Sequence, residues 1–139
     1  MLCAMIEFLK RLFSGGSNSR SYPNFGYAPR IAGGRVVREY SIGAYRAELM
    51  TDVRSTASVE YSHLLSVFGT DNEPVYFVAA EVNSMAAQIG GGSHYIGVFD
   101  GEGHASLQDS DEWADLESFA AEADRVAREH LRVDAADGT

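Results

Sequence analysis

Cysteine is almost absent from this chain, since Cys3 is the only one among 139 residues. A single cysteine excludes an intramolecular disulfide and any metal site built from several thiolates. We therefore expect a reducing, cytoplasmic setting and a fold held together by an apolar core. The composition, 45% hydrophobic and 22% charged residues, is that of an ordinary globular protein. The length is the usual size of one domain.

Long apolar runs are also missing. No stretch approaches the roughly 18 residues that a helix needs to cross a bilayer. The N-terminal sequence MLCAMIEFLKRLF is not typical of a secretory signal, because its positive charges follow the apolar stretch and no small-residue cleavage site comes after it. We predict neither a transmembrane segment nor export.

Lysine is scarce, because ten of the eleven basic residues are arginine, a bacterial-like bias typical of GC-rich genomes. The formal charge is −9, unevenly divided: residues 1–54 carry 8 − 4 = +4, and the remainder carries 3 − 16 = −13. A net acidic protein repels phosphate backbones, so no nucleic-acid partner is expected. The acidic part indicates either a solubilising surface or a surface that meets a basic partner protein.

The N-terminal region divides into a helix and a linker. An apolar stripe at helical spacing predicts a short amphipathic helix over residues 2–13. About twelve residues are marginal for an isolated helix in water, so it needs a partner. Three alternatives remain for what this helix packs against: the core of the domain, a second copy of the chain in a homodimer, or a membrane surface that it contacts weakly. Residues 14–34, rich in Gly, Ser, Asn and Pro, predict a linker or long loop.

Residues 35–139 are predicted to form one α+β domain. Alternating polarity and turn residues predict strands over 35–42, 44–53, 59–68, 75–82, 94–99 and 104–108. The alternation in 44–53 is typical of a half-exposed antiparallel strand, whereas the nearly all-apolar VYFVAA run indicates a central strand.

A long amphipathic helix follows, with Asp109 as its cap and Glu112 three residues later. Its apolar stripe runs from Trp113 to Leu131. We expect an antiparallel sheet of about five or six strands with this long C-terminal helix packed on one face.

The four histidines form no HxH, HExxH or HxxxH pattern, so we predict no metal site and no cofactor. His63 alternates with Tyr61 and Leu65 and is expected in the core. His130 lies near the C-terminus of the long helix, where its partial positive charge suits the helix dipole.

His94 and His104 bracket the 94–108 hairpin. If they approached each other near its open end and Glu81 or Asp100 joined them, a site of two histidines and one carboxylate would form.

The glycine-rich segment before residue 94 is the most distinctive stretch of the chain. Its consecutive glycines let backbone NH groups approach an anion closely. It lacks both the lysine of a phosphate loop and the GxGxxG spacing. The segment is either a flexible connection or a substrate loop with Ser93 and His94 as polar reagents. Neighbours on a strand point to opposite faces, which argues against a nucleophile–base pair formed by these two residues. The candidate ligand-binding residues are Gly91, Gly92, Ser93, His94, His104 and Glu81.

The acidic run 109–117 is expected to cap and solvate a helix start rather than to perform acid–base catalysis. Trp113 within it is either a core anchor or a protein-interaction hot spot. The candidate partner-binding residues are Asp111, Glu112, Trp113 and Asp115. Two hypotheses follow. The leading one is a non-catalytic acidic protein-interaction module; the alternative is a small-ligand binder or enzyme with a pocket near the Gly90–His94 loop.

Overall fold

The computed structural model describes residues 28–56 and 58–133. The predicted helix over 2–13 and most of the predicted linker lie outside these residues. The described elements follow one another as β1 (Ile31–Ile42), β2 (Tyr45–Ser55), β3 (Tyr61–Phe68), β4 (Pro74–Val82), α2 (Ala86–Ile89), β5 (His94–Asp100), β6 (Gly103–Ser110), the 3-10 helix η1 (Asp111–Ala114) and α3 (Leu116–Leu131).

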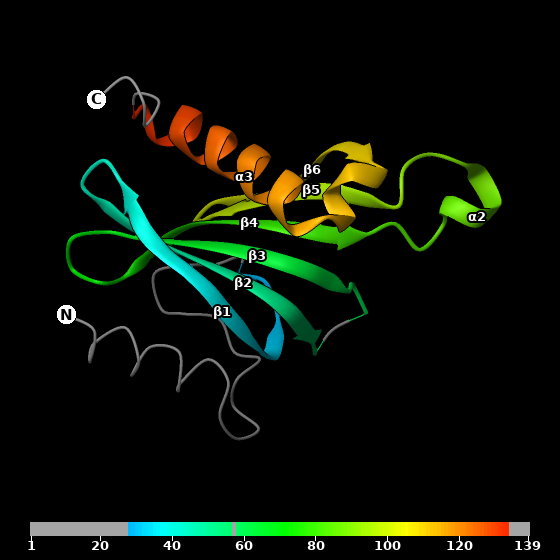
Figure 1. The fold of residues 1–139 in the computed structure, drawn as a ribbon, viewed down its shortest axis with the longest axis horizontal. Helices are drawn as coiled ribbons and strands as arrows, with labels where there is room; N and C mark the ends of the chain where they lie inside the picture. The colour runs from blue at the N-terminus through cyan, green and yellow to red at the C-terminus, as the bar shows by residue number, and fades with distance from the viewer. Residues whose placement is uncertain (1–27, 57, 134–139) are drawn as a thin grey trace.

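The six strands form one sheet in chain order, each antiparallel to the next. Figure 1 shows α3 lying across one face of this sheet. The predicted antiparallel sheet with a C-terminal helix on one face is therefore confirmed. One boundary differs, because residues 31–34 belong to β1 rather than to the linker predicted over 14–34. Ile31 is fully buried and anchors this end of the strand, a role that the neighbouring glycines obscure in the sequence.

One face of the sheet packs against the apolar stripe of α3. Phe119, Ala123 and Ala127 of the helix are fully buried there. They contact inward side chains of the strands, among them Leu49, Leu65, Val67, Tyr76, Val78, Ala80 and Ile96. Full burial of a large apolar side chain contributes about 1.5–3 kcal/mol, so this interface is a main source of stability.

The opposite face carries a second buried cluster, made of Ile31, Met50, Tyr61, Leu64, Phe68, Phe77, Ala79 and Phe99. The prediction that 44–53 is a half-exposed strand is wrong at its centre, because Glu48 and Met50 are each only 1% exposed. The alternation correctly assigns these residues to one face of the strand, but that face is buried instead of exposed. The central strands β3 and β4 consequently have apolar residues on both faces.

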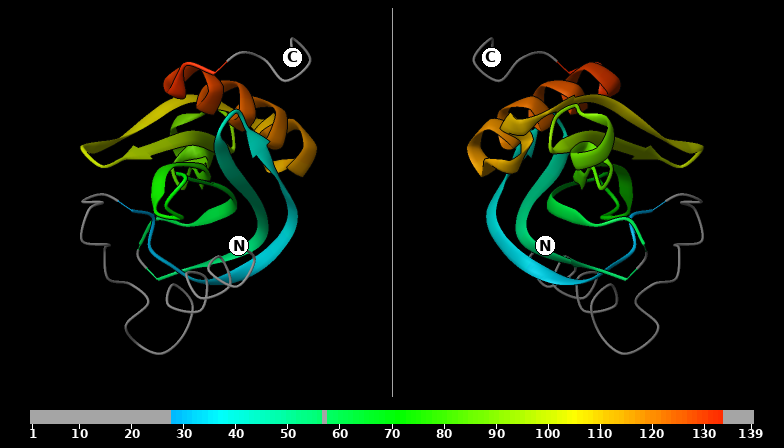
Figure 2. Two further views of the ribbon diagram at one scale, coloured as in Figure 1. Left: turned by 90° about the vertical axis from the view of Figure 1, so that its left-hand side faces the viewer. Right: turned by 90° about the vertical axis from the view of Figure 1, so that its right-hand side faces the viewer.

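The curvature of β1 and β2 helps to bury this second face. Figure 2 shows the two strands curving round beneath the middle of the sheet. Three register shifts interrupt the pairing of β1 with β2. In β2, Asp52 adopts a left-handed backbone conformation with φ +54°. Bulges of this kind bend a strand and increase its twist. Val36 and Val53 thereby pack against the second cluster.

The long helix begins later than predicted. Asp115, not Asp109, is its N-cap, and its side chain accepts a hydrogen bond from the Ser118 amide at 2.9 Å. This hydrogen bond lowers the pKa of Asp115 below its ordinary value. The residues between form η1, which is capped by the Ser110 hydroxyl. The acidic run contains several possible capping residues. Asp109 accepts from the Gly92 amide, and Trp113 is buried within η1, so the long helix starts after them.

A carboxylate is buried on the second face of the sheet. Glu48 is 1% exposed, and neither of its oxygens has a hydrogen-bond partner among the described residues. Its cross-strand neighbours are Glu39 and Ser66. Burial, and secondly the charge of Glu39, raise the pKa of Glu48 to about 7, although Arg46 opposes the shift. The folded protein therefore holds a proton here that the unfolded chain releases at lower pH.

We expect Glu48→Gln to remove a pH dependence of stability. A carboxyl whose pKa rises on folding stabilises the fold at low pH, and this contribution is lost as the pH rises from the unfolded value toward about 7. Wild type should therefore lose on the order of 2–3 kcal/mol more than the variant between about pH 5 and about pH 8. Urea unfolding at both pH values measures the difference. The exposed Glu73→Gln serves as the control, and an equal loss in wild type and Glu48→Gln would contradict the assignment.

Candidate functional site

A polar cleft of about 580 Å³ lies where β2 ends and β3 begins. Its walls are formed by residues 51–55 of β2, residues 60–63, Val82 of β4 and Ala114 of η1. The cleft is thus lined by residues of β2, β3, β4 and η1. The polar lining consists of the hydroxyl groups of Thr51, Ser55, Tyr61 and Ser62, the charged side chains Asp52, Arg54 and Glu60, and His63.

His63 forms the inner wall of this cleft and is 7% exposed. Its Nε2 lies 2.9 Å from the Ala114 carbonyl oxygen, and its Nδ1 lies 2.8 Å from the Thr51 hydroxyl. A carbonyl oxygen only accepts, so Nε2 carries a proton, and in the neutral ring Nδ1 accepts from Thr51. Both nitrogens are satisfied, and the ring packs against Phe119. The prediction that His63 is a core histidine with satisfied hydrogen bonds is confirmed.

Ser62 faces the cleft because of an irregularity in β3. The pairing of β3 with β4 shifts between Tyr61 and His63, so Ser62 is the extra residue at this point. Bulges re-aim a side chain in this way and are common next to active sites. The Ser62 hydroxyl consequently reaches His94 of β5, with its Oγ 2.9 Å from Nε2.

The second ring nitrogen of His94 contacts Ser93, with Nδ1 2.8 Å from Oγ. The expectation that Ser93 and His94 point apart fails because Ser93 precedes the strand, where alternation does not apply. His94 is 9% exposed. Burial, and secondly the proximity of His63, lower its pKa below 6.5, while Asp111 opposes the shift. The imidazole is therefore neutral at pH 7 and lies between two serine hydroxyls.

The glycine-rich loop is tied to two carboxylates of the same chain. The Gly92 amide donates to Asp109, and the Ser93 amide donates to Asp111 at 2.8 Å. Gly92 passes so close to Ser110 that a Cβ at residue 92 would overlap the backbone of β6. The anions that these two NH groups approach are thus side chains of the same protein. Gly91 adjoins this arrangement with its Cα beside Asp109.

Glu81 and His104 form a separate cluster on the other face of the sheet. Glu81 is 4% exposed, and its two oxygens lie 2.6 Å from Nε2 of His104 and 2.8 Å from the Ser106 hydroxyl. His104 stacks on Phe99, with ring centroids 4.3 Å apart. Gly97 makes room for the carboxylate, because a Cβ there would overlap it. The sequence placed Glu81 or Asp100 with both histidines; Glu81 contacts His104 alone, and its second partner, Ser106, was not among the candidates.

His94 and His104 do not converge. His94 pairs with Ser110, whereas His104 pairs with Phe99 at the other end of the hairpin. His130 stacks on Tyr76 and lies 3.9 Å from the Asp100 carboxylate. In the part of the chain that the structure describes, no group of three or more His, Cys, Asp or Glu side chains could hold a metal ion.

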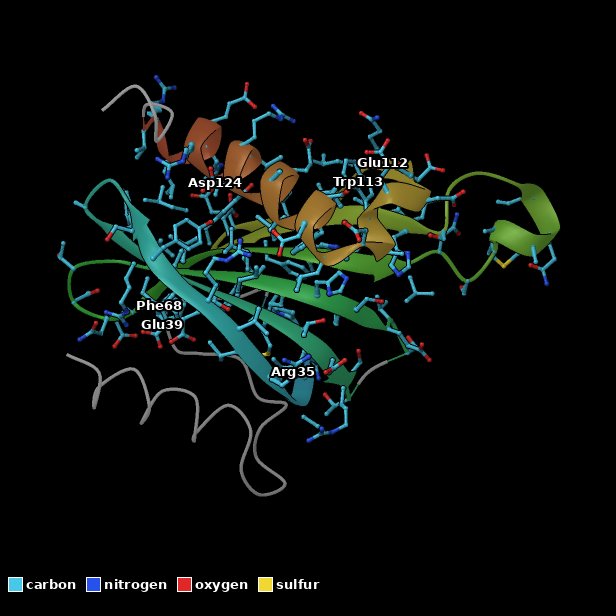
Figure 3. All side chains as sticks on the ribbon, in the orientation of Figure 1. Arg35, Glu39, Phe68, Glu112, Trp113 and Asp124 are labelled. Carbon is cyan, nitrogen blue, oxygen red and sulfur yellow. The ribbon has the colours of Figure 1, made fainter. Side chains whose placement is uncertain are left out.

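The four candidate partner-binding residues differ in accessibility. Trp113 is 7% exposed and donates from Nε1 to the Gln108 carbonyl at 3.1 Å, which makes it a core anchor. Asp111 and Asp115 accept hydrogen bonds from backbone amides. Glu112 points away from the sheet, as Figure 3 shows, and is exposed. A partner that binds this end meets Glu112 and the carboxylates but not the indole ring.

Sequence reasoning missed Ser62, Thr51 and Ser106. Each is one serine or threonine in an ordinary strand, and the contacts of Ser62 depend on a bulge that leaves no clear sequence signal. The polar position of Ser62 beside the predicted core residue His63 was the available hint.

No protein-family model, no curated protein and no solved structure matches this chain. Over residues 28–56 and 58–133, none of the helices has the length and apolar content needed to cross a bilayer.

We expect Asp109→Ala to loosen the glycine-rich loop. The substitution removes the carboxylate that accepts from the Gly92 amide. A hydrogen bond to a charged group contributes about 1.5–3 kcal/mol, so exchange of this amide should accelerate about 10- to 100-fold. Hydrogen exchange followed by NMR measures the change. Glu112→Ala removes a carboxylate from the same end of the molecule and should leave the Gly92 amide unaffected. Unchanged protection in Asp109→Ala would show that this contact does not hold the loop.

Proposed function

We propose that this protein is a protein-interaction module that pairs the free edge of β6 with an extended, basic segment of a partner protein. The observation that carries the proposal is the position of β6 at the end of the sheet. It pairs with β5 on one side, and no described strand pairs with it on the other. An open strand edge presents unpaired NH and C=O groups to another chain.

The side chains of β6 leave this edge accessible. The five consecutive residues 104–108 are all exposed, and they include Leu107, which is 42% exposed. Ala105 pairs with Val98 and Ser106 pairs with Gly97, and a register shift follows before Asp109, which pairs with Tyr95. Over residues 104–106 an added strand therefore meets Ala105 on one face and the polar side chains of His104 and Ser106 on the other, which gives a partner side-chain selectivity as well as backbone hydrogen bonds.

The charge around β6 favours a basic partner. Between Arg54 and Arg125 the chain contains thirteen acidic residues and no lysine or arginine. Of these, Asp100 and Glu102 lie at the turn before β6, and Glu112 follows it in η1. Clustered charge of one sign raises the association rate of oppositely charged partners and makes it sensitive to salt.

The same charge disfavours pairing of two β6 strands in a homodimer, because each copy brings the same carboxylates to the contact. The opposite edge of the sheet is less suited to strand addition. β1 has three register shifts and carries Arg35 and Arg38, and irregular, charged edges resist pairing. β6 is thus the better edge for a partner, and the partner is a different chain.

A defined peptide tests the proposal. We expect a peptide of alternating lysine and valine or threonine to shift the backbone NMR signals of β6 at low salt. The same peptide with glutamate in place of lysine should not bind. Binding of the lysine peptide should weaken as the salt rises to about 0.5 M, where charges are screened within a few ångströms. Shifts confined to α3, or equal binding of both peptides, would refute the use of β6.

Charge reversal provides the matched comparison. Glu102→Lys places a positive charge at the turn before β6 and should weaken binding of the lysine peptide several-fold. Glu73→Lys makes the same change in net charge at the turn between β3 and β4. It should have a much smaller effect. Equal effects of the two variants would indicate attraction by net charge alone.

A further inference from the structure

The contacts of His94 define a chain of three side chains that ends in the polar cleft. Ser62 Oγ lies 2.9 Å from Nε2 of His94, and Ser93 Oγ lies 2.8 Å from Nδ1. A hydroxyl, a histidine and a third group that orients the histidine form the general arrangement of an activated nucleophile. Ser62 is half-buried and lines the cleft, so a ligand in the cleft can reach its hydroxyl.

We propose that Ser62 is a nucleophile activated by His94, and that the cleft catalyses acyl transfer from a small ester to water. Ser93 is a positioning residue that holds the imidazole through Nδ1. This activity goes beyond the partner-binding function proposed above and does not depend on it. The cleft is formed at the ends of β2 and β3, whereas the proposed partner edge is β6.

The hydrogen bonds permit the tautomer that this role needs. A neutral imidazole has one donor and one acceptor nitrogen. If Nδ1–H donates to Ser93 Oγ, then Nε2 accepts from the Ser62 hydroxyl and can take its proton. The opposite tautomer would make Ser62 an acceptor and leave it inert. Burial and the neighbouring His63 favour the neutral ring, which is the form that acts as a base.

The carboxylate of Asp111, next to Ser93, would stabilise the imidazolium of His94 that forms during the reaction. Asp111 accepts a hydrogen bond from the Ser93 amide at 2.8 Å. Its negative charge raises the pKa of His94, but the opposing effect of burial is larger. Asp111 meets the Ser93 backbone rather than its hydroxyl, so no proton passes to it. Its contribution is electrostatic stabilisation of the imidazolium.

The reaction is balanced with water as the second reactant. The Ser62 oxygen bonds to the ester carbonyl carbon while its proton moves to Nε2 of His94, and the alcohol leaves with that proton. Water then attacks the acyl-serine and gives a proton to His94, which returns it to Ser62 Oγ as the acid is released. The cleft of about 580 Å³ has room for a small ester.

A fluorophosphonate tests the nucleophile on the full-length folded chain. The Ser62 oxygen forms a bond to phosphorus, fluoride leaves, and the proton passes through His94 to solvent. We expect one phosphonyl group per chain, mapped to Ser62 by peptide mass spectrometry. Ser62→Ala should abolish the modification, and His94→Gln should slow it about 100-fold or more. Ser93→Ala should slow it less, by about 10-fold, because it only positions the base.

Ser118→Ala is the matched control, because Ser118 lies in α3 and does not line the cleft, and it should react as wild type does. The rate for wild type should be half-maximal below pH 6.5, where His94 takes up a proton. Thermal melting shows whether each variant folds. If one does not, the pH dependence of the wild-type rate and the mapped labelling site still test the role of Ser62 and His94. Absence of labelling, labelling at another residue, an equal rate in urea or indifference to His94→Gln would each overturn the proposal.

Discussion

Burial of the central strands on both faces is the constraint on which the rest of the structure depends. β3 and β4 carry apolar side chains on either side, so the sheet needs cover above and below. α3 supplies it on one face through Phe119 and the alanines of its stripe. On the other face, the curvature of β1 and β2 brings Ile31, Val36 and Val53 against the same strands. A flat sheet of this sequence would leave aromatic side chains such as Phe77 in water, at a cost of about 1.5–3 kcal/mol each.

The elements with a clear period were predictable from the sequence, whereas their departures from regularity were not. The apolar period of two gave the six strands, and the stripe ending at Leu131 gave the long helix. The cap lies at Asp115 although Asp109 also suits a helix start; in the structure the Asp109 side chain accepts from the Gly92 amide instead. The burial of Glu48 was unpredictable for a related reason, since alternation shows which residues share a face but not whether that face is covered.

The same distinction explains what could be predicted of the candidate site. Glu81 and His104 were both candidates from the sequence, and regular pairing across β4, β5 and β6 brings them to one face, whereas the predicted approach of His104 to His94 does not occur. The contact of Ser62 with His94 requires an extra residue in β3, and that of Ser93 requires a residue just outside β5. Both contacts depend on places where regular strand pairing is interrupted or has not begun. A prediction from alternating side chains assumes regular pairing, so it cannot find them. The contacts of His94 with Ser62 and Ser93 therefore lie where the strand pairing is irregular or has not yet begun.

The acidic residues divide into two groups with different physical roles. Glu81, Asp109, Asp111 and Asp115 each accept hydrogen bonds from other groups of the chain. Such contacts fix the glycine-rich loop and the start of α3, and a partner that competed for them would have to unfold the loop. The exposed Glu102 and Glu112 have no such structural task among the described contacts, so their charge faces solvent. Their charge can be matched by a partner without a cost in folding, which is why the surface around β6, and not the acidic run as a whole, is the part of the molecule suited to association.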